Sequence, residues 1–126
     1  HAVWVALHTF AKLLKGTALL IFEDNEAARH SLTSGATANV AAALLVHYVW
    51  QEFQKLDILP WIARVPSKSN PADAPSRLEF NQGRALGWTK VSAEFPDHSV
   101  LPTTAPALAD QLAANLSTLR AVCRNA

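Results

Sequence analysis

The apolar positions at the start of the chain predict a helix followed by a strand. Residues 2–15 carry an apolar stripe at α-helical spacing, formed by Val3, Leu7, Phe10 and Leu14. Two lysines and then Gly16 are typical of a helix C-terminus, because cations complement the helix dipole and glycine adopts the left-handed cap conformation. Residues 17–22 form a continuous apolar run, which predicts a short buried strand.

An acidic segment, FEDNEAA, follows this strand and predicts the start of a second helix. We expect the helix to begin near Asn25 and to end before Gly35, with Glu26 in its first turn. Asp24 has two interpretations. It is either the N-cap of this helix, or a metal ligand at the end of a strand, and the local sequence leaves both open.

A longer helix and a second strand come next. Residues 37–56 have an apolar face made of Val40, Leu44, Leu45, Tyr48, Val49, Phe53 and Leu56. Residues 58–65, ILPWIARV, predict a strand in which Pro60 leaves a gap in the hydrogen-bond ladder. The connection from strand 17–22 to this strand is long enough for parallel pairing, so the pattern predicts an α/β fold.

The remaining residues predict less regular structure. Residues 66–77 are rich in Pro, Ser and Asn and form a loop with room for one helical turn. We expect an edge strand at residues 88–91 and a linker at residues 96–106. The last predicted element is an amphipathic helix at residues 107–122, with Leu108, Leu112, Leu116 and Leu119 on its apolar face.

Composition narrows the class of protein. The chain has 126 residues, half of them hydrophobic, which is enough for one domain with a core. We therefore expect a domain at residues 1–95 and a linker with a C-terminal helix at residues 96–126.

The net charge of +1 gives no overall basic field for nucleic acid, and one cysteine excludes an internal disulfide. The chain begins at His1 and contains no methionine, so we expect a fragment of a longer protein. No signal peptide and no membrane-spanning run is predicted.

Two acids follow the two predicted strands. Asp24 ends the first strand, and Asp73 lies on the loop after the second. The carboxyl ends of neighbouring parallel strands share one edge of a sheet, so both carboxylates can face that edge. Carboxylate oxygens are the ligands of Mg²⁺, and two such ions clamp the attacking and leaving oxygens of a phosphodiester.

The strand ending in FEDNEAA, the two helices, and the segment WIARVPSKSNPADAPSR resemble the ribonuclease H domain of retrotransposon reverse transcriptases over residues 1–77. The resemblance implies a ribonuclease H-like mixed sheet of five strands flanked by helices. In that family four acids bind two Mg²⁺ ions and cut the RNA strand of an RNA–DNA hybrid. Asp24 and Asp73 match two of these acids and are implied as the catalytic and metal-binding residues.

The same resemblance implies that part of the domain is missing. Residues 1–15 match the later part of the family's first helix, which places the family's glutamate just before His1. The first three strands, with the first aspartate, are expected to be missing too. A histidine of many cellular members is replaced here by Lys68. We therefore expect the chain to be inactive alone.

Other polar residues are candidates for contacts with the nucleic acid. Glu26 is close enough in sequence to Asp24 to reach a substrate groove, and its alternative role is to complement the helix dipole. Ser67, Lys68 and Asn70 are candidates for substrate binding, against the alternatives of a solvated loop and, for Asn70, a turn residue.

Three functions therefore follow from the sequence. The first is a metal-dependent hydrolase acting on RNA–DNA hybrids, with the reverse transcriptase portion of the same polyprotein as partner. The second is a catalytically inactive connection or nucleic-acid-binding module of the same fold. The third, a phosphate-accepting receiver domain, needs an acidic pair on its first strand and a late lysine, and the sequence places neither. The expected location is intracellular, either cytoplasmic or nuclear, without a membrane.

Overall fold

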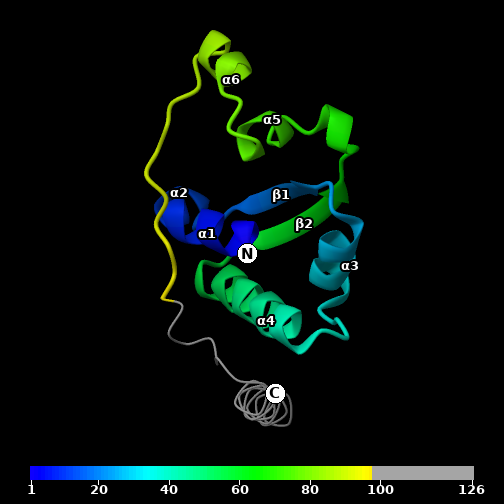
Figure 1. The fold of residues 1–126 in the computed structure, drawn as a ribbon. Helices are drawn as coiled ribbons and strands as arrows, with labels where there is room; N and C mark the ends of the chain where they lie inside the picture. Colours follow the sequence, from blue (N-terminus) through cyan, green and yellow to red (C-terminus); the bar gives the residue numbers. More distant parts are fainter. Residues whose placement is uncertain (98–126) are drawn as a thin grey trace, which may run out of the picture.

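The computed structural model describes residues 1–97, which form a small mixed α/β domain (Figure 1). In chain order its elements are α1 (Ala2–Thr9), α2 (Ala11–Leu14), β1 (Ala18–Glu23), α3 (Glu26–Ser34), α4 (Val40–Lys55), β2 (Leu59–Arg64), the 3₁₀ helix η1 (Ser67–Ser69), α5 (Asp73–Ser76) and α6 (Asn81–Ala85). The predicted helix at residues 107–122 and most of the predicted linker lie outside the described residues. The α/β class predicted from the sequence is confirmed.

The two strands lie side by side and run in parallel, as predicted. Their register runs from Ala18 opposite Leu59 to Glu23 opposite Arg64. Gly16, which has the left-handed φ of 72°, begins this pairing by donating its N–H to the carbonyl of Leu56 at 2.8 Å. Within the described residues the sheet has these two strands only, so the five-stranded sheet of the ribonuclease H-like fold is not seen there.

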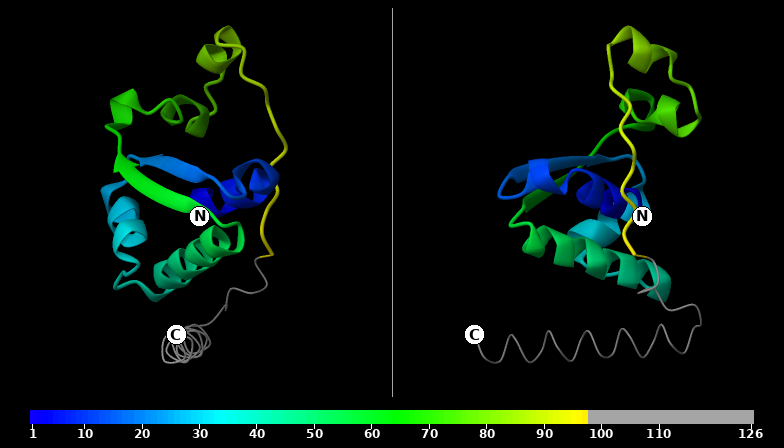
Figure 2. Two further views of the ribbon diagram at one scale, coloured as in Figure 1. Left: turned by 180° about the vertical axis from the view of Figure 1, so that it is seen from behind. Right: turned by 90° about the vertical axis from the view of Figure 1, so that its left-hand side faces the viewer.

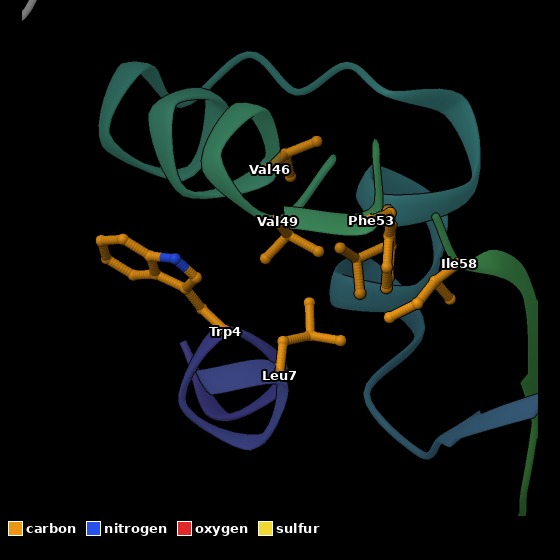
Figure 3. Close-up of a cluster of buried hydrophobic side chains, with 7 residues drawn as sticks. Trp4, Leu7, Val46, Val49, Phe53 and Ile58 are labelled. Atoms are coloured by element: carbon orange, nitrogen blue, oxygen red, sulfur yellow. The ribbon is translucent and has the colours of Figure 1, made fainter. Parts of the chain in front are cut away.

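The core lies between one face of the sheet and the helices α1, α3 and α4. Its buried residues are Trp4, Leu7, Leu32, Val46, Val49, Phe53 and Ile58 (Figure 3). Two contacts join the helices across it: the Trp4 ring stacks on Tyr48 with centroids 5.3 Å apart, and the indole N–H of Trp50 donates to the carbonyl of Leu32 at 3.0 Å. The core therefore holds α3 and α4 in place beneath the strands.

The opposite face of the sheet is apolar and exposed. It carries Leu20 and Phe22 from β1 and Leu59 and Trp61 from β2. The prediction that residues 17–22 form a buried strand is therefore wrong for half of its side chains, because the packed helices cover one face only. Helices α5 and α6 lie on the exposed side without covering these residues (Figure 2).

Two other predictions need correction. The single helix predicted at residues 2–15 is broken at Phe10, whose backbone leaves the helical region with φ −109° and ψ 16°. The edge strand predicted at residues 88–91 does not form. Trp88 instead packs on Gly83, where an added Cβ would lie 2.6 Å from the indole, and the backbone N–H of Trp88 donates to the Gly83 carbonyl at 2.9 Å. This local bond removes a donor that a strand would need.

None of the helices in residues 1–97 combines the length and the apolar character that a membrane span requires.

Candidate metal-binding and nucleic-acid-binding site

The connection between β1 and α3 decides which residue caps the helix. Asn25 has extended backbone angles and its side-chain oxygen accepts a hydrogen bond from the N–H of Ala28 at 3.0 Å. The N–H of Asn25 in turn donates to the carboxylate of Glu23 at 3.1 Å. Because strand pairing continues through Glu23, the cap falls one residue later than the sequence suggested. The capping interpretation of Asp24 is wrong.

Asp24 is left as a half-buried acid directly after β1. Its carboxylate makes no hydrogen bond and no ion pair with any residue of the described part of the chain. An acid without a structural partner at the carboxyl end of a parallel strand keeps both oxygens available for a ligand.

The loop after β2 holds Asp73 in a different way. The side-chain oxygen of Asn70 accepts a hydrogen bond from the N–H of Ala72 at 3.0 Å, which confirms the predicted turn role of Asn70. Asp73 is the first residue of α5, and its N–H donates to the Asn70 carbonyl at 3.1 Å. Arg77, one turn later, lies 3.1 Å and 3.0 Å from the two oxygens of Asp73. Asp73 is therefore an acid with a cationic partner, and Ala72 occupies the N-cap position.

Asp24 and Asp73 follow two neighbouring parallel strands, which is the strand arrangement that the predicted metal site requires. Both supply the oxygen ligands that Mg²⁺ prefers. Two acids alone are too few ligands for a metal site. Within residues 1–97, no group of three or more His, Cys, Asp or Glu side chains could hold a metal ion. The donor chemistry fits the metal, and a complete site needs further ligands.

Glu26, the first candidate for substrate binding, is engaged by two arginines. Arg29 donates two hydrogen bonds to its carboxylate, and the Nε of Arg64 on β2 lies 3.6 Å from it. The hydrogen bond from Arg29, supported by the charges of Arg29 and Arg64, lowers the pKa of Glu26 below its ordinary 4.5. This acid links α3 to the end of β2, close to the junction that carries Asp24.

The candidates on η1 are exposed. Ser67 and Lys68 both lie on the surface, and the Lys68 amine has no ion-pair partner in the described part of the chain. A free amine on the loop that leads from β2 to Asp73 is suited to a phosphate contact.

A pocket of about 590 Å³ lies beside the β1–α3 junction. Its lining includes Glu23 and Asn25 on either side of Asp24, together with Ser31, Asn39 and residues of α1 and α4. Neither Asp24 nor Asp73 lines it, so this pocket is distinct from the candidate metal site.

Two arginines without a role predicted from the sequence lie against the candidate acids. Arg77 contacts Asp73 and Arg64 contacts Glu26. The spacing of Asp73 and Arg77, four residues apart at a helix start, is a signal for the first pair. The second pair joins segments far apart in the sequence and has no local signal.

Comparisons with known proteins identify no relative: no family model, no curated protein and no solved structure matches the chain.

Proposed function

We propose that this chain is part of a ribonuclease H-like nuclease domain of a retroelement polyprotein, which hydrolyses the RNA strand of RNA–DNA hybrids. Asp24 and Asp73 are two of its four metal-binding acids. The other two are supplied by the polypeptide upstream in the same polyprotein, next to its reverse transcriptase portion. The chain by itself does not cut a hybrid, because two carboxylates do not hold a pair of metal ions.

The observation that carries this proposal is the free carboxylate of Asp24. A structural role at the β1–α3 junction would place the acid at the helix N-terminus, and Asn25 already fills that role. Asp24 is half-buried and without a partner in residues 1–97, at the edge of a parallel sheet where sites gather. A ligand role accounts for an acid in this position.

The two outer edges of the sheet also support the proposal. The carbonyl of Thr17 accepts a hydrogen bond from Leu59, and that of Glu23 accepts one from Val65, directly after β2. The backbone groups of Ala18, Leu20 and Phe22 therefore point to the outer edge of β1. None of these three residues is a proline or carries a charge, and an apolar pocket of about 380 Å³ lined by Phe10, Leu13 and Leu20 lies next to them.

The outer edge of β2 is less suited to pairing with a further strand. There the backbone groups of Pro60, Ile62 and Arg64 point outward, and proline offers no N–H for pairing. The asymmetry favours continuation of the sheet on the β1 side, as a ribonuclease H-like sheet with upstream strands requires.

In this proposal, the residues of this chain bind the metal and position the substrate. Mg²⁺ held at this site would supply Lewis-acid stabilisation of the phosphodiester oxygens and would activate a water molecule. Asp24 and Asp73 would hold the metal, and Lys68 would contact the backbone phosphate. The Asn70 carbonyl, which accepts a hydrogen bond from the N–H of Asp73, fixes the backbone at that residue. Recognition of the hybrid depends on its shape and 2′-hydroxyls rather than on base sequence.

A catalytically inactive connection or nucleic-acid-binding module of the same fold is the second candidate. The Asp73–Arg77 ion pair favours it, because Arg77 lies against both carboxylate oxygens that a metal would need.

The deciding experiment uses the chain extended by its upstream reading frame and a labelled RNA–DNA hybrid with Mg²⁺. We expect cleavage that Asp24→Asn abolishes. The matched control is Asp57→Asn, which removes one carboxylate at the opposite end of β2, at a φ of 54° that asparagine tolerates. The control should cleave normally. If the extended protein binds the hybrid without cutting it, or if its upstream frame lacks both acids, the inactive module is the correct function.

A further inference from the structure

The outer edge of β1 is the part of the described surface most suited to binding another strand. The backbone groups of Ala18, Leu20 and Phe22 point outward along it, and β2 is the only strand that pairs with β1 within residues 1–97. An unpaired edge of this kind offers a row of N–H and C=O groups to another strand. The outer edge of β2 does not offer the same row, because Pro60 has no N–H.

Apolar side chains flank the β1 edge on both faces of the sheet. On the bare face, Leu20 is 52% exposed and Phe22 is 58% exposed. On the helix side, a pocket of about 380 Å³ opens beside the strand, and its lining includes Phe10 and Leu13, which are 37% and 76% exposed. A strand that pairs here therefore buries apolar surface as well as backbone groups.

We propose that this edge binds the same edge of a second copy of the chain, so that two β1 strands pair in antiparallel across a two-fold axis. The pattern along the edge is self-complementary. With the axis at Leu20, Leu20 lies opposite its counterpart and Ala18 lies opposite the second Phe22, which places a small side chain against a large one. Thr17 then lies opposite Glu23, so no like charges meet along the pair. The result is a four-stranded sheet in the order β2–β1–β1–β2.

This register makes the fullest use of the outward groups. All three outward residues fall in hydrogen-bonded positions, where opposed residues exchange both of their N–H···O bonds, which gives about six bonds. A slide by two residues in either direction keeps only two of the three residue pairs within β1. A slide by one residue turns the outward groups of one strand away from those of the other.

The size of the interface predicts a weak dimer. The four flanking side chains and the strand edge present on the order of 500 Å² per copy, so the dimer buries about 1,000 Å² in total. That area is close to the smallest at which protein interfaces are specific, and we expect a Kd in the micromolar range or weaker.

The dimer goes beyond the proposed nuclease function and does not depend on it. In the longer protein of that proposal, upstream strands compete for the same edge. An association assay on this chain alone and a cleavage assay on the extended protein therefore test the two proposals separately, and either can fail without the other.

Sedimentation equilibrium of the full 126-residue chain measures the association. We expect a monomer–dimer equilibrium whose Kd rises by about tenfold in Leu20→Lys, because an apolar pair is lost and two like charges meet at the axis. Trp61→Lys is the matched control. Trp61 lies opposite Leu20 on β2 and on the same bare face, and its variant should change the Kd little, because the two added charges lie more than a screening length apart.

Two results of this measurement overturn the proposal. The first is a chain that stays monomeric at concentrations up to about 1 mM. The second is an equal rise of the Kd in Leu20→Lys and Trp61→Lys, which would mean that two copies associate through their bare faces instead.

Cross-linking tests the register without a charged variant. In a Cys123→Ser background, Leu20→Cys places two cysteines opposite each other with Cα atoms about 5.5 Å apart, within the range that a disulfide spans. Ala18→Cys is the control at the same edge, because its two copies lie four positions apart along the strands, at about 14 Å, and cannot bond. We expect a covalent dimer from Leu20→Cys and none from Ala18→Cys. No covalent dimer from Leu20→Cys, or equal amounts from both variants, overturns the proposal.

Discussion

The two strand-to-helix connections that carry the candidate acids are held in different ways. The β1–α3 connection leads into a helix that the core anchors through Leu32 and that ends at Gly35 with a left-handed φ of 69°. The β2–α5 connection leads into an arm, residues 66–88, which packs little against the rest of the domain. Neither η1 nor α5 contains a buried residue.

The difference extends to the acids themselves. In the anchored connection, Asn25 provides the cap and leaves Asp24 free. In the arm, Asn70 and Arg77 both engage Asp73, one through the backbone and one through its carboxylate. An anchored helix can leave an acid unpaired, whereas a short helix without core contacts depends on local polar contacts for its conformation. The contrast therefore separates Asp24, whose carboxylate has no partner within residues 1–97, from Asp73, whose carboxylate is paired with Arg77.

The largest expected difference between the two connections concerns packing. Leu32→Ala should lower the free energy of unfolding by about 2–5 kcal/mol, because Leu32 of α3 is buried in the core. Leu86→Ala in the arm, where the side chain is exposed, should change it by less than about 0.5 kcal/mol. Urea unfolding of both variants measures this, and similar losses would show that the arm is anchored after all.

The next effect concerns capping. Asn25→Ala should lower the free energy of unfolding by about 1 kcal/mol, because the N–H of Ala28 loses its hydrogen-bond acceptor. Asn39→Ala, which removes the same kind of cap from Ala42 in α4, should cost a similar amount. Asp24→Ala should be close to neutral. The free energies of unfolding are measured with urea. If Asp24→Ala lowers this free energy as much as Asn25→Ala does, the assignment of Asn25 as the cap is contradicted.

A smaller effect is expected in the arm. Arg77→Gln should lower the free energy of unfolding by less than about 1 kcal/mol, because the Arg77 side chain of the Asp73–Arg77 pair is exposed to solvent. The difference from the native chain should shrink in high salt. Arg84→Gln, which removes an arginine without an ion-pair partner in the described residues, serves as the control. A salt-independent loss would point to a packing role for Arg77.

The smallest effect is a dependence on pH. The pKa of Glu26 is lowered by the Arg29 hydrogen bond, so its stabilising contribution is present above the unfolded pKa and is lost as pH falls through the folded pKa. NMR titration of the Glu26 carboxylate should give a pKa below 4.5, and Arg29→Gln should raise it. An unchanged titration in the variant would exclude the Arg29 bond as the cause.

The sequence predicted the elements well where local signals decide them. Gly16 and Gly35 mark the ends of their helical segments because both adopt positive φ, and the apolar runs locate both strands. The length of the connection between the strands predicts their parallel pairing. Asn25 was missed as the cap because Asp24 and Asn25 are equally good capping residues. The two residues are distinguished only by the strand pairing, which continues through Glu23 and moves the start of the helix one residue later.

Other features had no local signal. An apolar run does not reveal that one face of β1 stays bare, since this depends on which helices pack against it. The strand predicted around Trp88 does not form, because the backbone N–H of Trp88 donates to the nearby Gly83 carbonyl instead. For the site, the topology and the turn at Asn70 followed from sequence. The Arg77 contact needed the three-dimensional structure.

The most direct test of the central claim, that Asp24 and Asp73 share a metal site, is an NMR titration of the full chain with Mn²⁺. This paramagnetic ion takes the same oxygen ligands as Mg²⁺ and reports weak binding through signal broadening. We predict that the amides next to Asp24 and Asp73 broaden together, that Asp24→Asn removes both effects, and that Asp57→Asn removes neither. Broadening at Asp73 that persists in Asp24→Asn, or broadening that is equal around Asp57, would contradict a shared site.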